Sequence, residues 1–155
     1  MQELVRKESI QIAERDKLLV LRYLAAPTLA TAQVLADVLR KKLADSPGRQ
    51  HAFLVIIDAA NPVPERAVQE ALAKLMREHA SQVAAMANVV VGQGFQAAGI
   101  RFAMVAMSML SRPEYPLKGC KSIGEALAWI STTAPQSLAA RDVDAVRAEI
   151  EQLAS

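Results

Sequence analysis

The stretch that decides the fold is VVVGQGFQAAGIRF, residues 89–102. An apolar, valine-rich run enters a glycine turn and continues as an apolar segment, which predicts a strand, a tight turn and a helix in succession. The same stretch also suggests two other structures, a dinucleotide-binding turn and a membrane anchor. The choice among the three separates a cofactor-dependent enzyme, a membrane protein and a small α/β domain.

The dinucleotide interpretation rests on Gly92, Gly94 and Ala97, which match the spacing G-x-G-x-x-G/A. Dinucleotide-binding folds carry this motif after their first strand, with an acidic residue at the end of the second strand about 20 residues later. Here the motif lies two thirds along the chain, and the nearest acid, Glu114, precedes the next predicted strand. We therefore expect no nucleotide cofactor.

The membrane interpretation fails on length. A helix needs about 20 consecutive apolar residues to cross a bilayer. The apolar run is interrupted at residues 92–94, and the segment beyond carries Gln96 and Arg101. The stretch is therefore predicted to be a buried strand, a turn and a core helix, and the chain is not expected to span a membrane.

Composition excludes several further classes. The 155 residues suffice for one domain, and 18 basic against 16 acidic residues give a net charge of +2 without a basic block. With only 4% aromatic residues, a base-stacking surface for nucleic acid is not expected. A single cysteine, Cys120, excludes an internal disulfide and a cysteine-based zinc site. The N-terminus has no apolar signal region, so a cytoplasmic protein is expected.

Hydrophobic periodicity and turn residues predict a single α/β domain with a mixed sheet of about four to five strands, backed by helices. An N-terminal antiparallel hairpin comes first, and parallel strands joined by right-handed crossovers follow it. The expected strands are residues 10–12, 18–24, 51–58, 83–91 and 115–120, and the expected helices are residues 28–43, 64–79, 95–111 and 122–129.

The C-terminal region, residues 134–155, is predicted to be a linker and an amphipathic helix added to a domain of residues 1–133. A stripe of Val143, Val146, Ile150 and Leu153 marks the apolar face of this helix. Such a short helix is marginal alone in water, so the stripe must pack on its own domain or on a second copy. We expect a homodimer in which the tail helps and the sheet domain supplies most of the interface.

Several segments in this order resemble the STAS/SpoIIAA-like superfamily of sulfate-transporter and anti-sigma-factor-antagonist domains, and most closely a bacterial branch described as STAS/SEC14-like. The resembling segments are TLATA (28–32), LVIID (54–58), GFQAAGIR (94–101), RPEYP (112–116) and SIGEALAWI (122–130). The resemblance implies a sheet backed by helices, with a regulatory or ligand-sensing role and no chemistry of its own.

The chain departs from this family at one functional position. Anti-sigma-factor antagonists carry a serine after an aspartate at the start of the helix that follows the central strand, and a kinase phosphorylates it. The equivalent residues 58–67, DAANPVPERA, contain no serine or threonine. Glu65 could supply a permanent negative charge there, but the usual phosphorylation switch is not expected.

Few residues stand out as candidates for a site. Asp58 ends the central strand, where open α/β sheets tend to bind ligands, and it could instead cap its own loop. Arg101 could hold an anionic ligand, while Phe95, Phe102 and several methionines could line an apolar pocket. The histidines, His51 and His79, lack converging carboxylates, so no metal site is expected. Cys120 has two nearby lysines that could lower its pKa, but it lacks an identifiable base.

Two functions follow from different classes. The favoured hypothesis is a non-catalytic regulatory or signalling module that binds a protein partner, with a filled core and an exposed apolar patch. The alternative is a domain that binds a small molecule or lipid, with an apolar cavity beneath the predicted helix of residues 95–111. An enzyme is not expected, because no nucleophile–base pair and no carboxylate pair can be placed.

Overall fold

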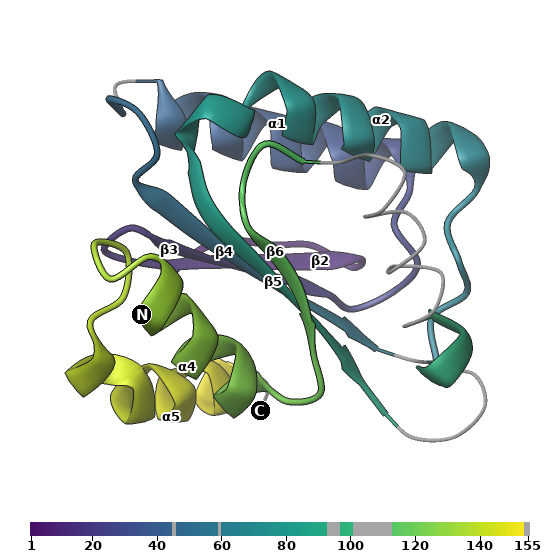
Figure 1. The fold of residues 1–155 in the computed structure, drawn as a ribbon. Coiled ribbons are helices and arrows are strands. Elements are labelled where there is room, and N and C mark those ends of the chain that lie inside the picture. Colours follow the sequence, from purple (N-terminus) through teal and green to yellow (C-terminus); the bar gives the residue numbers. More distant parts are fainter. Residues whose placement is uncertain (45, 59, 93–96, 101–112, 154–155) are drawn as a thin grey trace.

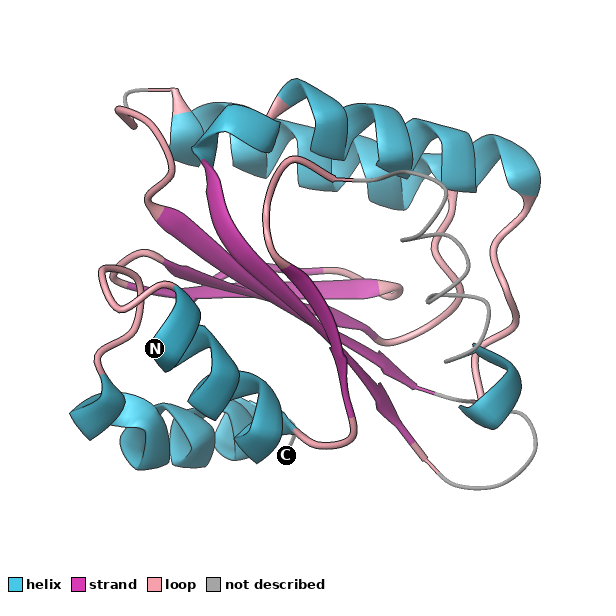
Figure 2. Ribbon diagram, in the orientation of Figure 1, coloured by secondary structure: helices cyan, strands magenta, loops and turns pink. Residues whose placement is uncertain are grey.

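The fold is a single twisted sheet between two layers of helices (Figures 1 and 2). The computed structural model describes the whole chain except residues 45, 59, 93–96, 101–112 and 154–155. The predicted helix of residues 95–111 therefore lies mostly outside the described residues. The part of it that is described, residues 97–100, is helical.

Within the described part of the chain, six strands form the sheet, in the same order as in the sequence. They are β1 (Gln2–Arg6), β2 (Ile10–Arg15), β3 (Leu18–Tyr23), β4 (His51–Asp58), β5 (Val83–Val91) and β6 (Leu117–Cys120). The first three pair antiparallel, and β3 through β6 pair parallel. The mixed sheet is confirmed, with one strand more than the expected four to five.

The additional strand is β1, which the sequence pattern did not indicate. It lies at the sheet edge beside β2, and none of its residues is fully buried. An edge strand with little burial lacks the apolar alternation by which strands are recognised. Pairing with β2 therefore defines this strand more than its own composition does.

A two-residue turn joins β2 to β3. Arg15 pairs with Leu18, so Asp16 and Lys17 form the loop. Asp16 has a φ of 54°, in the left-handed region that aspartate tolerates better than most residues. Two-residue loops with such residues match the twist of antiparallel strands, which explains the tight hairpin.

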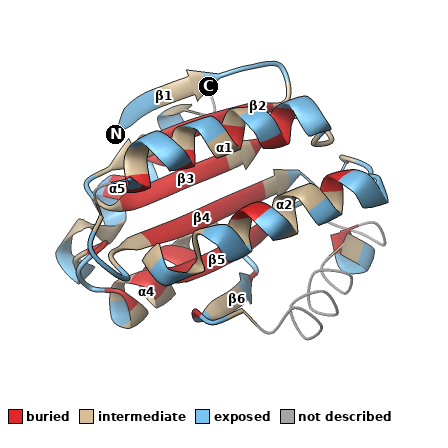
Figure 3. Cartoon of the chain, turned by 90° about the horizontal axis from the view of Figure 1, so that it is seen from above, coloured by how far each residue is buried: buried red, intermediate tan, exposed pale blue. Residues whose placement is uncertain are grey.

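Helices cover both faces of the sheet (Figure 3). Helices α1 (Leu29–Leu43) and α2 (Arg66–Glu78) cover one face, and α4 (Ile123–Thr133) and α5 (Val143–Leu153) cover the other. Alternate residues of the central strands enter opposite cores. Leu21 and Val55 pack toward α1 and α2, whereas Val20 and Leu54 pack toward α4 and α5. This two-sided burial explains the nearly continuous apolar runs of β4 and β5.

Helix caps agree closely with the sequence pattern. The Thr28 hydroxyl accepts a hydrogen bond from the Thr31 backbone N–H, and the Thr31 hydroxyl accepts one from the Thr28 N–H. Ser122 caps α4 by accepting from the Glu125 N–H, as predicted. The Glu125 carboxylate in turn accepts a hydrogen bond from the backbone N–H of Lys121, the residue just before Ser122.

The C-terminal stripe is buried within its own chain. Val146 and Ile150 are 0% and 2% exposed and belong to the same core as the central strands, and α5 packs on α4. Val143 packs partly against that core, and Leu153 is half-buried. The tail and the sheet domain thus share one core. The homodimer stays a prediction. Because Val146 and Ile150 are buried in their own chain, its interface would have to use other surfaces.

Candidate functional site

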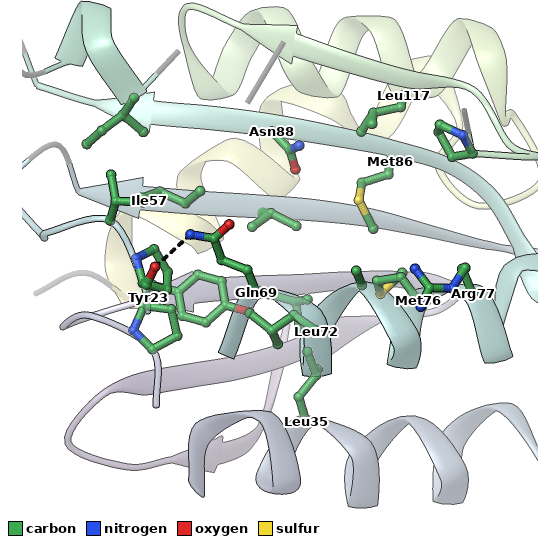
Figure 4. Close-up of a pocket in the computed structure, with 18 of the residues that line it drawn as sticks. Tyr23, Leu35, Ile57, Gln69, Leu72, Met76, Arg77, Met86, Asn88 and Leu117 are labelled. Atoms are coloured by element: carbon green, nitrogen blue, oxygen red, sulfur yellow. Dashed lines mark hydrogen bonds between the residues drawn. The ribbon is translucent and has the colours of Figure 1, made fainter. Parts of the chain in front are cut away.

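An apolar pocket of about 510 Å³ lies between α2 and the sheet face that α1 and α2 cover. This volume falls within the range of small-molecule sites. Strands β3 to β6 supply the floor with Leu21, Tyr23, Val55, Ile57, Met86, Asn88 and Leu117, and α2 supplies a wall with Gln69, Leu72, Ala73, Met76 and Arg77. Figure 4 labels Tyr23, Ile57, Met86, Asn88 and Leu117 on the strands and Gln69, Leu72, Met76 and Arg77 on α2.

Parallel pairing of the strands brings the floor residues together. Leu21 pairs with Val55, and Val55 pairs with Asn88, so these three side chains form one row across the sheet. Tyr23 and Ile57 form part of the next row along the strands. Because alternate residues point to the same face, both rows face α1 and α2.

The described rim of the pocket is built from loops. Pro27 and residues 61–64 border it on one side, and Ile100 and residues 113–115 border it on another. Two amides hold the first of these loops. The Asn61 side chain donates to the Tyr23 backbone carbonyl at 3.3 Å, and Gln69 Nε2 donates to the Pro64 carbonyl at 2.7 Å. These bonds attach the loop before α2 to both the sheet and the helix.

The polar groups that described residues bring to the interior of the pocket are uncharged. Burial raises the pKa of Tyr23 to about 12 and also raises the pKa of Tyr115, so both hydroxyls stay protonated at neutral pH. Asn88 is the one polar residue in the strand VAAMANVVV. The charged residues among the described lining, Arg77 and Glu114, are both exposed. The described part of the pocket lining therefore offers neutral hydrogen-bonding groups inside and charges only at the exposed rim.

Two of the predicted site residues, Asp58 and Glu65, lie among the described residues. Asp58 is exposed at the end of β4, and its carboxylate accepts from the Ala60 N–H at 2.9 Å, so it caps its own loop. Glu65 is an exposed N-cap of α2 whose side chain makes no capping bond. Neither lines the pocket. Phe95, Arg101 and Phe102 lie outside the described residues.

Sequence reasoning missed two of the pocket's polar residues, Tyr23 and Asn88. The lone amide inside an otherwise apolar run was a signal available in the sequence. For Tyr23 no such signal exists, because a tyrosine ending an apolar strand is common in ordinary cores. Of the methionines considered for a pocket, Met86 does line it.

The remaining reactive residues have local structural surroundings. His79 Nδ1 lies 3.0 Å from Gln82 Oε1, and no cluster of potential metal ligands occurs among the described residues. Cys120 is buried, and burial together with Glu125 raises its pKa against the opposing effect of Lys118. Lys118 thus acts on this pKa in the suggested direction, but burial and Glu125 outweigh it, and the net shift is upward.

Four large apolar side chains are exposed on the described surface. They are Leu24 after β3, Leu29 in the first turn of α1, Val63 before α2 and Val91 at the end of β5. All four lie at the carboxyl ends of parallel strands or at the starts of the helices that follow, which is one edge of the sheet.

The described helices include none with the length and apolar composition that crossing a bilayer requires.

Comparison with known proteins identifies the fold. No protein-family model and no curated protein matches the chain. The chain is similar to the crystal structure of an uncharacterized protein of the DUF3478 family, with a SpoIIAA-like fold, from Shewanella loihica PV-4. The two superpose with a TM-score of 0.59 at 15% identity, over 77% of this chain and 90% of the other. At that identity the likeness concerns the fold alone, and the chain has the expected SpoIIAA-like fold.

Proposed function

We propose that this chain is a non-catalytic binding domain for an apolar small molecule, held in the pocket beside α2. One observation carries the proposal, namely a space of about 510 Å³ whose described walls are apolar except for a few neutral groups and exposed charges at the rim. A ligand with a matching apolar body would remove these walls from water and restore the dispersion contacts that an open groove lacks. The alternative function named from the sequence thus has the stronger support.

The regulatory protein-interaction module remains a second candidate. Its support is the group of exposed apolar residues at the carboxyl edge of the sheet, Leu24, Leu29, Val63 and Val91. Val63 also lines the pocket, so ligand binding and partner binding would share a surface. The two functions are compatible, since a ligand that orders this edge of the sheet would change the surface that a protein partner binds.

Native mass spectrometry of the purified full chain tests the ligand directly. We expect the intact protein to carry added mass that organic extraction releases as an apolar small molecule. The neutral fluorophore N-phenyl-1-naphthylamine should bind the emptied protein with enhanced fluorescence.

A matched pair of α2 variants locates the binding. Ala73 lines the pocket, whereas Ala67 is exposed on the same helix and does not. Ala73→Phe should fill part of the space and weaken fluorophore binding at least tenfold, while Ala67→Phe should leave it unchanged. Absence of added mass and of fluorophore binding, with a crystal structure in which the chain's own side chains fill the space, would overturn the proposal.

A further inference from the structure

Three described side chains, Tyr23, Asn88 and Tyr115, bring neutral polar groups to the pocket. Among the described residues, no hydrogen bond is made by the Tyr23 hydroxyl, the Tyr115 hydroxyl or the Asn88 amide. Both tyrosines are only 8% exposed, and all three residues line the pocket. Asn88 is half-buried, and none of these polar atoms is fully closed off, so each can reach a polar group of a molecule bound in the pocket.

Their positions follow from the strand register. Asn88 pairs with Val55 on β4, and Tyr23 pairs with Ile57 two residues further along that strand. The asparagine and the tyrosine are thus two strands apart, about 10 Å across the sheet, in neighbouring rows. Asn88 lies in the floor (Figure 4). Tyr23 lies beside the rim loop of residues 61–64, whose Asn61 donates to the Tyr23 backbone carbonyl.

Helix α2 sets the length of the site. Its lining residues run from Gln69 to Arg77, which is about 12 Å along the helix axis. Leu72 and Met76 between them present an apolar wall. An elongated apolar body fits this wall better than a compact one.

The charges argue against an ionised ligand. Arg77 is exposed, so its guanidinium is solvated and gives no buried counter-ion. Glu114 adds a negative charge at the rim, and the described interior holds no charged side chain. Burying an ionised carboxylate without a partner costs far more than burying a hydroxyl or an amide.

We infer that the site takes an elongated, uncharged amphipathic molecule whose polar group, a hydroxyl, carbonyl or amide, hydrogen-bonds to Asn88. This rests on the proposed ligand-binding function and specifies its chemical class. The Asn88 amide both donates and accepts, so it can serve any of these groups. Tyr23 offers a second donor to a ligand with another oxygen at its far end. The remaining length of the ligand packs along Leu72 and Met76.

Displacement of N-phenyl-1-naphthylamine from the emptied full-length protein tests the chemical class. The competitors are 1-decanol and decanoate at pH 8, which share a chain length and differ in charge. We expect 1-decanol to compete at least tenfold more strongly than decanoate. Equal competition, or stronger competition by decanoate, would overturn the inference while leaving the apolar site intact.

Asn88→Leu tests the anchor. This variant removes the amide at similar size and should weaken 1-decanol about tenfold, which corresponds to one hydrogen bond of about 1.4 kcal/mol. Its affinity for the fluorophore should stay equal or rise. Gln136→Leu is the matched control, because the Gln136 amide is exposed and donates to the distant Arg49 carbonyl at 3.3 Å.

The outcomes separate the two levels of the proposal. Failure of the wild-type protein to bind the fluorophore would count against the proposed function itself. Fluorophore binding with unchanged 1-decanol competition in Asn88→Leu would refute only the role of the amide. Circular dichroism of both variants checks that the sheet is intact, and an apolar residue in β5 is expected to preserve it.

Discussion

The Arg15 guanidinium, at the end of β2, donates to the Glu149 carboxylate of α5 at 2.5 Å. The N-terminal amine of Met1 binds the other oxygen of the same carboxylate. Glu149 thereby ties the C-terminal helix to the N-terminal hairpin across most of the length of the sequence. The charges are partly shielded, since the two side chains are 28% and 31% exposed.

Replacing Glu149 should loosen this attachment. Glu149→Gln should lower the free energy of unfolding by about 1 kcal/mol, because a charge-assisted pair and the amine contact are both lost. Glu151→Gln is the control, since Glu151 is exposed and binds Arg147 one turn earlier on the same helix. Urea denaturation measures both. Equal losses in the two variants would show that Glu149 contributes no more than an ordinary surface pair.

Truncating an apolar side chain of the C-terminal stripe should lower the free energy of unfolding by more than Glu149→Gln does. Ile150 is 2% exposed in the core of its own chain, so Ile150→Ala should lower the free energy of unfolding by about 2–4 kcal/mol. Light scattering on the same samples measures the predicted homodimer. A variant that turned a dimer into a monomer at unchanged stability would place the stripe between two subunits instead.

Alkaline pH should destabilise the protein through Tyr23. Its pKa is raised from 10.0 to about 12 in the folded protein by burial, so the unfolded chain ionises first. The stabilisation is complete below about pH 10 and is lost as pH rises toward 12, by about 3 kcal/mol in full. The folded protein should show this tyrosine ionising late by absorbance at 295 nm. Tyr23→Phe should flatten the decline in stability, and an unchanged decline would contradict the assignment.

Mild acid should destabilise the protein through His51. Burial and then Lys17 lower its pKa below 6.5, against an opposing effect of Glu14. The unfolded chain therefore takes up the proton first, so the stabilisation is present above about pH 6.5 and is lost as pH falls through the folded-state pKa. Its buried Nδ1 has no hydrogen-bond partner among the described residues.

The measurement is the slope of unfolding free energy between pH 7 and 5. His51→Gln should reduce this slope relative to wild type, while His79→Gln, which changes the other histidine, should retain it. A wild-type slope in His51→Gln would assign the acid sensitivity to other groups.

Local sequence was sufficient for most elements of the fold. Continuous apolar runs indicated β4 and β5 because both faces of these strands are buried. Thr28 and Ser122 indicated helix starts because a side-chain cap is a contact between residues three apart. Strand β1 was not predicted from the sequence, because its side chains are mostly exposed and its main stabilising partner is β2.

The pocket was decided by tertiary structure. Tyr23 and Asn88 belong to strands separated by an intervening strand, and only the parallel register brings them to one face beside α2. Sequence reasoning chose Asp58 by a general rule for α/β sheets and Glu65 by the family resemblance. It had no information on which loops border an open space. Phe95, Arg101 and Phe102 stay untested as ligand contacts.

The tail shows the same division most clearly. The three- and four-residue spacing of Val143, Val146 and Ile150 was enough to predict an amphipathic helix, because helix geometry alone places such residues on one face. Periodicity cannot name the surface that this face meets. That choice was made by the shape of the sheet and of α4, which leave an apolar surface that α5 covers, and by the charges of Arg15 and Met1 that bind Glu149.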